Sequence, residues 1–198
     1  MAAREDGGIL LPIARAAIVR ALGCKVSAAE EAPWLQDVGA CFVTLTQEGH
    51  LRGCIGTIQA RRPLLQDLKE NAVAAALHDP RFRPLVAQEL EYTRIEVSLL
   101  SPMQALTFNS EGDALAQLRP GVDGLVFEFE HYRSTFLPQV WEQLPDPREF
   151  MAQLKNKAGL PHRFWAEGVR LHRYSVRQWT ESELAEPNAD NGPRHHGH

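Results

Sequence analysis

The sequence predicts an α+β fold with a mainly antiparallel sheet and flanking helices, and three observations support this class. Segments rich in β-branched and aromatic residues alternate along the chain with segments whose apolar residues recur at helical spacing. Two pairs of strand-like segments are separated only by short turns, and such hairpins pair their strands antiparallel. The chain contains no phosphate loop or dinucleotide-binding glycine motif. An α+β fold is therefore favoured over a doubly wound parallel sheet.

Four segments have the apolar spacing of helices. Residues 9–22 form the first, with Gly23 as a stop signal and Pro12 tolerable only near the first turn. Pro63 opens the clearest helix, which has an apolar stripe that includes Leu68 and should end near residues 78–80. Asp67 is expected on the surface of this helix. Shorter helices are expected at residues 112–118 and 147–157.

Strands are predicted from alternation and β-forming residues. Residues 40–46 and 51–57 flank a turn at residues 47–50 and should form a hairpin. In residues 93–100, Ile95 and Val97 should face one side of the sheet and Glu96 the other. Further strands are expected at 124–130 and 132–137, joined near residues 130–131 by a tight turn or, if the two are one long strand, by a bend. Residues 169–179 are expected to form one long closing strand.

Composition excludes several classes of protein. The 198 residues carry a formal net charge of −4, with basic residues scattered along the chain. This balance disfavours DNA binding and makes RNA binding an unfavoured alternative. The start of the chain lacks the features of a secretory signal, and no apolar run reaches the roughly 18 residues of a membrane span. A soluble, cytoplasmic protein without a membrane partner is expected.

Cysteine usage agrees with that location. Cys24, Cys41 and Cys54 are well separated and form no Cys-x-x-Cys pair. Free thiols suit a reducing compartment. No spacing of histidines or carboxylates predicts a metal cage, so neither a metal nor another cofactor is expected.

The segment Leu51-Arg52-Gly53-Cys54-Ile55-Gly56-Thr57 is the most informative in the chain. In an extended strand, Arg52 and Cys54 would share one face, and residues 51, 55 and 57 the other. A cation beside a thiol favours the reactive thiolate, whereas Gly53 and Gly56 would allow a ligand or another backbone to approach closely. Two alternatives stay open. Cys54 is a reactive thiol or a small buried side chain, and Arg52 orients an anion or pairs with a carboxylate such as Glu96.

This segment resembles the signature of the AMMECR domain family, and other stretches match that family in order. These are residues 74–75 and 79–82, Pro84, the strand 95–98, residues 124–125, 136–141 and 157–160. The resemblance extends to about residue 184. Within the family the chain is most similar to the bacterial branch called AmmeMemoRadiSam system protein A.

The resemblance implies a single domain over residues 1–184 with two unequal lobes and the signature near the cleft between them. It also implies a Memo-like protein and a radical S-adenosylmethionine enzyme as partners. Lys157 falls in a matched stretch and either binds a carboxylate or phosphate or only complements the C-terminus of a helix. The family often has cysteine where this chain has Lys155, so a mechanism that pairs Cys54 with a second cysteine there is not expected.

Two functional hypotheses follow. In the first, Cys54 is the catalytic nucleophile or redox thiol of a modification pathway, and Arg52, Gly53, Gly56, Thr57, Glu96 and Lys157 bind the substrate. In the second, the protein is a non-catalytic adaptor or binding module, in which the same residues shape a binding surface. His78 is a weaker candidate for a base that serves Cys54. Residues 185–198, which include His195, His196 and His198, are expected to form a disordered tail.

Overall fold

The computed structural model describes residues 2–184, so the predicted disordered tail lies outside the described residues. The described chain divides into two compact units. Unit 1 comprises residues 2–99 and 178–184, and unit 2 comprises residues 100–177. The α+β class with mainly antiparallel sheets is confirmed, because the strand pairs with a determined register are all antiparallel.

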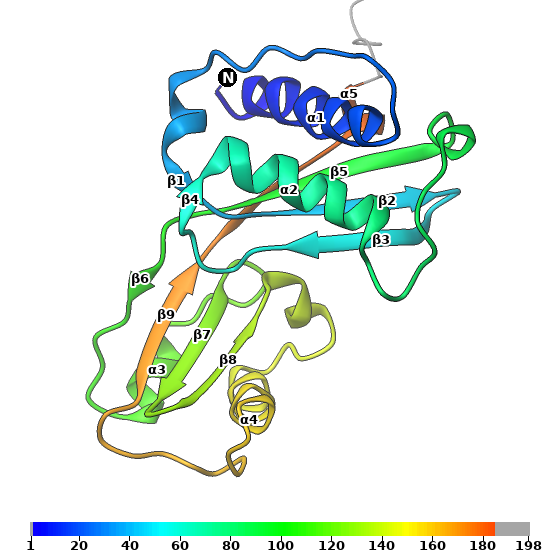
Figure 1. Cartoon of the computed structure of the whole chain (residues 1–198). Coiled ribbons are helices and arrows are strands. Elements are labelled where there is room, and N and C mark those ends of the chain that lie inside the picture. Colours follow the sequence, from blue (N-terminus) through cyan, green and yellow to red (C-terminus); the bar gives the residue numbers. More distant parts are fainter. Residues whose placement is uncertain (1, 185–198) are drawn as a thin grey trace, which may run out of the picture. The chain divides into compact units, whose positions relative to one another are not determined.

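Unit 1 contains a four-stranded sheet in the order β10-β5-β2-β3 and a short two-stranded sheet, β1-β4. The elements are α1 (Ala2–Ala21), β1 (Val38–Gly39), β2 (Cys41–Gln47), β3 (His50–Gly56), β4 (Arg62–Pro63), α2 (Leu64–Leu77), β5 (Thr93–Leu100), β10 (Val176–Thr180) and α5 (Glu181–Leu184). Helices α1 and α2 lie on the same face of the sheet (Figure 1). The core of unit 1 lies between these helices and the sheet, where Leu10 and Leu68 of the helices pack with Val43 and Val97 of the strands.

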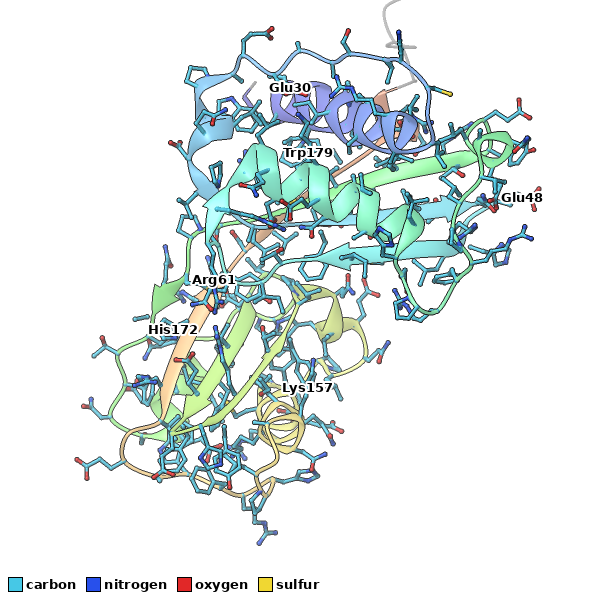
Figure 2. The ribbon with its side chains drawn as sticks, in the orientation of Figure 1. Glu30, Glu48, Arg61, Lys157, His172 and Trp179 are labelled. Atoms are coloured by element: carbon cyan, nitrogen blue, oxygen red, sulfur yellow. The ribbon has the colours of Figure 1, made fainter. Side chains whose placement is uncertain are left out.

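The β2–β3 hairpin is confirmed, and its turn explains how it closes. Gln47 pairs with His50, so the loop has two residues, Glu48 and Gly49. Both have positive φ, 50° and 80°, as a type I′ turn requires. Figure 2 shows Glu48 at the tip of the hairpin. This turn fixes which residues of β2 and β3 lie opposite one another.

Unit 2 contains a second four-stranded sheet, in the order β6-β9-β7-β8. Its elements are β6 (Gln104–Ala105), α3 (Glu111–Ala116), β7 (Gly124–Phe129), β8 (Tyr132–Phe136), α4 (Pro147–Lys157) and β9 (Arg170–Tyr174). Phe127 of β7 packs with Phe150 and Leu154 of α4 in its core. Trp141 stacks on Phe150 at 3.8 Å between ring centroids, and its Nε1 donates to the Asp123 carbonyl at 2.7 Å.

Two predictions of element boundaries were wrong. The predicted closing strand 169–179 is two strands that belong to different sheets, β9 and β10, separated at Ser175. The first helix begins at Ala2, so Pro12 lies inside it and not in its first turn. The helix is held by burial of one face, with Leu10, Ile13 and Ile18 each at most 1% exposed, which outweighs the lost hydrogen bond at proline.

Candidate functional site

Three polar side chains form a row across unit 1. Thr44 of β2 lies opposite Cys54 of β3 on one side and Glu96 of β5 on the other. Residues directly opposite in an antiparallel sheet project to the same face. Each of the three is half-buried. Their neighbours Val43 and Val97 belong to the helix-covered core, so the row lies on the face away from α1 and α2.

Cys54 is held by side-chain and backbone contacts. The Thr44 hydroxyl lies 3.2 Å from its Sγ and donates a hydrogen bond to it. Its backbone N–H donates to Asp79 Oδ2 at 2.9 Å, and its carbonyl accepts from Arg81 Nη2 at 3.1 Å. The backbone N–H and carbonyl of Cys54 therefore point away from β2, which makes Cys54 and Thr44 a non-hydrogen-bonded pair. The side chains of opposed residues lie closest at such a pair.

Asp79 and Arg81 form the charged part of the site. Arg81 donates to both carboxylate oxygens of Asp79, at 2.9 and 2.7 Å. This pairing, helped by the N–H groups of Cys54 and Arg81 and opposed by burial, holds the pKa of the Asp79 carboxyl well below its usual range. The Asp79 side chain is only 2% exposed, whereas that of Arg81 is 54% exposed. Arg81 also interacts electrostatically with the Cys54 side chain. The cation close to the thiol is therefore Arg81.

The prediction that Arg52 shares a face with Cys54 was wrong. Gly53 lies opposite Leu45, whereas Leu51 lies opposite Thr46, so Arg52 is an extra residue in β3. This irregularity interrupts the alternation of side chains. Leu51, not Arg52, is thus on the face of Cys54.

Glu89, not Glu96, is the carboxylate partner of Arg52. The guanidinium donates to both Glu89 oxygens, at 3.1 and 3.0 Å, and to the Arg83 carbonyl at 3.0 Å. The Arg52 hydrogen bonds, assisted by the Val86 N–H and opposed by burial, lower the pKa of Glu89 to about 2. Glu96 makes no ion pair with another residue of the described chain. Arg52 therefore anchors the segment that follows α2.

The two glycines of the signature are required by protein packing. A Cβ at Gly53 would lie 2.1 Å from the Ala75 carbonyl oxygen, because α2 passes directly over β3. A Cβ at Gly56 would lie 2.2 Å from the ring of Phe42, its partner on β2. Both close approaches are to the protein itself.

Thr57 joins a buried polar cluster instead of the row. Its hydroxyl donates to Asp67 Oδ1 at 2.8 Å, and Asp67 also accepts from Arg62, Asn71 and the Cys41 N–H. Asp67 is 0% exposed, so the prediction that it lies on the surface was wrong. These four donors compensate its burial. Burial and the Asp67 charge raise the pKa of the Cys41 thiol.

Lys157 belongs to unit 2. It lies in the last turn of α4, and its Nζ donates to the Thr135 carbonyl at 2.9 Å. Figure 2 labels Lys157 beside α4. Lys155, on the same helix, is buried, and its Nζ donates to Glu111 at 2.6 Å and to the Phe164 carbonyl at 2.9 Å. The two lysines two positions apart thus have opposite environments.

Three residues that contact Cys54, namely Thr44, Asp79 and Arg81, were not among the predicted site residues. Thr44 was treated only as a strand residue, although its pairing with Cys54 follows from the hairpin register. Asp79 and Arg81 were placed at a helix end without a link to Cys54. Asp79 and Arg81 lie two positions apart directly after α2, and α2 approaches β3 where the Ala75 carbonyl meets Gly53. This acid–x–base spacing was the available signal that the two residues lie near Cys54. His78 is exposed and makes no hydrogen bond to Cys54.

Residues 2–184 contain no group of three or more histidine, cysteine or acidic side chains placed to hold a metal ion. In the same range, no helix has the length and apolar character needed to cross a bilayer.

Comparison with known proteins places the chain in a family. The AMMECR1 family model matches residues 11–179. Protein MJ0810 of Methanocaldococcus jannaschii is 37% identical over 90% of this chain and 92% of its own length, and a Methanothermobacter thermautotrophicus protein is 39% identical over 90% and 95%. The crystal structure of protein PH0010 from Pyrococcus horikoshii superimposes with a TM-score of 0.74 and 32% identity, covering 89% of this chain and 92% of that one. The chain therefore belongs to the AMMECR1 family.

Proposed function

We propose that the protein is a thiol-dependent component of a modification pathway and that Cys54 contacts an anionic substrate on the helix-free face of unit 1. The observation that carries this proposal is the position of Cys54 between a hydroxyl donor and a cation. Thr44 donates to Sγ at 3.2 Å, and the half-exposed Arg81 interacts with the same side chain. A thiol reacts through its sulfur, which Thr44 holds in place here beside a cation that can bind the anionic group of a substrate.

Arg81 has the properties of an anion-binding residue held in place. Nε and Nη2 bind Asp79, and Nη2 also binds the Cys54 carbonyl. These contacts fix the guanidinium plane, while 54% of the side chain remains exposed to an incoming group. Glu96, at the other end of the row, is half-buried and would contact the same substrate. In this arrangement Arg81 takes the role that the sequence suggested for Arg52.

The pathway and its partners are proposed from family resemblance. They are a Memo-like protein and a radical S-adenosylmethionine enzyme, as in the bacterial AmmeMemoRadiSam branch. The proposed substrate is a small molecule or peptide that carries an anionic group next to an electrophilic atom. This chemistry requires the thiol and the Arg81 cation together.

One experiment tests the site without knowledge of the substrate. Cys54 is alkylated with iodoacetamide, which is neutral, and with iodoacetate, which is anionic, in a Cys24→Ser background. Cys24 is exposed and would react, whereas Cys41 is buried and has a raised thiol pKa. We expect Arg81→Gln to lower the iodoacetate-to-iodoacetamide rate ratio roughly fivefold, because one nearby charge contributes about 1 kcal/mol at an exposed site. Peptide mass spectrometry identifies the modified residue.

Two controls make the result specific. Arg83→Gln removes an arginine that is 83% exposed and lies near Glu89, and it should leave the ratio unchanged. Arg81→Lys keeps the charge and should retain most of the ratio even where pairing with Asp79 is weakened. A Cys54 that is inert in the folded protein, or a ratio that Arg81→Gln does not change, overturns the proposal.

A second candidate, a non-catalytic adaptor, is favoured by a different observation. Four signature residues, Arg52, Gly53, Gly56 and Thr57, are each engaged by the protein itself. A segment used in this way builds a rigid surface. If the adaptor is correct, Cys54→Ser leaves binding of the partner proteins unchanged, and Arg81→Ala weakens it.

A further inference from the structure

Unit 2 contains a polar pocket that the proposed function does not use. Its volume is about 310 Å³, within the range of small-molecule sites. All its lining residues belong to unit 2: Ser101, Pro102, Gln104, Arg119, Arg173, Tyr174 and Ser175. Apart from Tyr174, the ionisable lining residues are Arg119 and Arg173, so the charged part of the lining is cationic.

The pocket is built where β9 meets the segment that leads into β6. Gln104 pairs with Arg173 across these strands. Beyond that pair, the Ser101 N–H donates to the Ser175 carbonyl at 2.9 Å, and the Ser175 N–H donates to the Ser101 hydroxyl at 2.9 Å. The hydroxyl groups of Tyr174 and Thr135 share a hydrogen bond of 3.1 Å. Burial raises the pKa of Tyr174, so the tyrosine is neutral. The frame of the pocket is therefore fixed by strand pairing.

Arg173 is a half-buried cation that the described chain does not neutralise. Its Nε donates to the Gln104 side-chain oxygen at 3.5 Å, and its Nη1 donates to the Gln117 carbonyl at 3.2 Å. Both acceptors are uncharged. No carboxylate within residues 2–184 forms a salt bridge with Arg173, and its Nη2 makes no hydrogen bond there. A cation in this setting is stabilised by an anion that supplies the missing acceptors.

Arg119 differs, because its charge is already balanced. Its Nε and Nη2 donate to Asp123 Oδ1 at 3.0 and 2.6 Å, and Asp123 is fully buried. The Arg119 side chain is still 54% exposed, and its Nη1 makes no hydrogen bond within the described chain. The pocket thus offers two fixed guanidinium donors but only one uncompensated charge.

We propose that this pocket binds a small phosphate monoester. A phosphate group accepts hydrogen bonds from two guanidinium groups at once, and the Ser175 hydroxyl and the Gln104 amide offer further polar contacts. The volume exceeds that of a phosphate ion, and the lining has few apolar side chains, so the rest of the ligand is polar and of polyol or sugar size. Arg173 Nη1 caps α3, because it donates to the carbonyl of Gln117 at the end of that helix. This accounts for one donor of Arg173 and leaves Nη2 without a hydrogen-bond partner among residues 2–184.

The test is titration of the full chain with inorganic phosphate and with glycerol 3-phosphate, followed by amide chemical shifts in NMR. We expect saturable shifts at Ser101, Gln104 and residues 173–175, with a dissociation constant on the order of millimolar for inorganic phosphate. Glycerol 3-phosphate should bind more tightly. Arg173→Gln should weaken both about tenfold, the effect of one charge-assisted hydrogen bond.

The controls separate this site from the one at Cys54. Arg170→Gln removes an arginine on the same strand that is 66% exposed and pairs with Glu128, and it should leave binding unchanged. Arg119→Gln is a second pocket variant and should weaken binding less than Arg173→Gln. Shifts confined to residues 52–57 and 79–81, equal weakening by Arg170→Gln, or no saturable shift overturns the proposal. Equal affinity for the two phosphates overturns the assignment to a phosphate monoester.

Discussion

Two ion pairs, one from each unit, differ in which partner is buried. In unit 1 the acid is the more buried partner at Asp79–Arg81, with side chains 2% and 54% exposed. In unit 2 the base is the buried one at Lys155–Glu111, 2% and 32% exposed. Asp79 accepts hydrogen bonds from two backbone N–H groups, whereas Lys155 donates to one carbonyl. Asp79 therefore fixes backbone at the candidate site, whereas Lys155 mainly fills core space beside Trp165.

The largest effect is expected from Asp79→Asn. The substitution removes the charge that Arg81 pairs with and weakens the hydrogen bond to the Cys54 N–H. Charged, buried partners are costly to replace, and we expect a loss of about 3 kcal/mol in the free energy of unfolding. Urea denaturation measures the loss, and hydrogen exchange should show faster exchange of the Cys54 amide. Unchanged protection of that amide would mean that Asp79 does not fix β3.

The acid sensitivity of unit 1 should come partly from Glu89. Its folded-state pKa of about 2 lies below the ordinary value near 4.3, so its stabilising contribution is fully present above about pH 4.5. That contribution should be lost as the pH falls from about 4.5 to about 2, by an amount on the order of 2 kcal/mol.

Glu89→Gln provides the check. The difference in unfolding free energy between the native chain and this variant should shrink over the same interval of pH. The same substitution at Glu70, a carboxylate that is 51% exposed, is the control for the loss of a surface carboxylate. A constant difference for Glu89→Gln would contradict the assignment.

The smallest effect is expected from Lys155→Met. Methionine occupies the space of the lysine stem, and Glu111 is exposed enough to be hydrated once its partner is lost. We expect a cost of about 1 kcal/mol, against about 3 kcal/mol for Lys155→Ala, which leaves a cavity. Thermal unfolding compares the two variants. Equal costs would show that the ion pair, not the packing, makes Lys155 important, and would remove the contrast with Asp79.

Local patterns predicted most elements of the fold. The strand at Thr93–Leu100 and the helix at Pro147–Lys157 have the predicted bounds, because alternation and helical spacing are properties of short segments. The break at Ser175 was missed because residues on both sides form β-strands, and only their different sheets separate them.

The candidate site was predicted only in part. Cys54 and Glu96 do lie on one face, in the same row, because strand register brings them there. The irregularity at Arg52 and the burial of Asp67 depend on contacts between segments distant in sequence, with Glu89 and with Cys41. Such contacts leave no periodic signal, so the roles of Arg52 and Arg81 could not be told apart from spacing.

One consequence of the Asp79–Arg81 contacts concerns association between molecules. β3 is the last strand of its sheet, and a strand in that position offers unpaired backbone groups to any extended chain. At Cys54 both groups are already occupied, the amide by Asp79 and the carbonyl by Arg81. The same two side chains that hold Cys54 therefore occupy the backbone groups through which another chain could pair with this edge, and a chain that lost them would leave the edge open to fibrous self-assembly at Cys54.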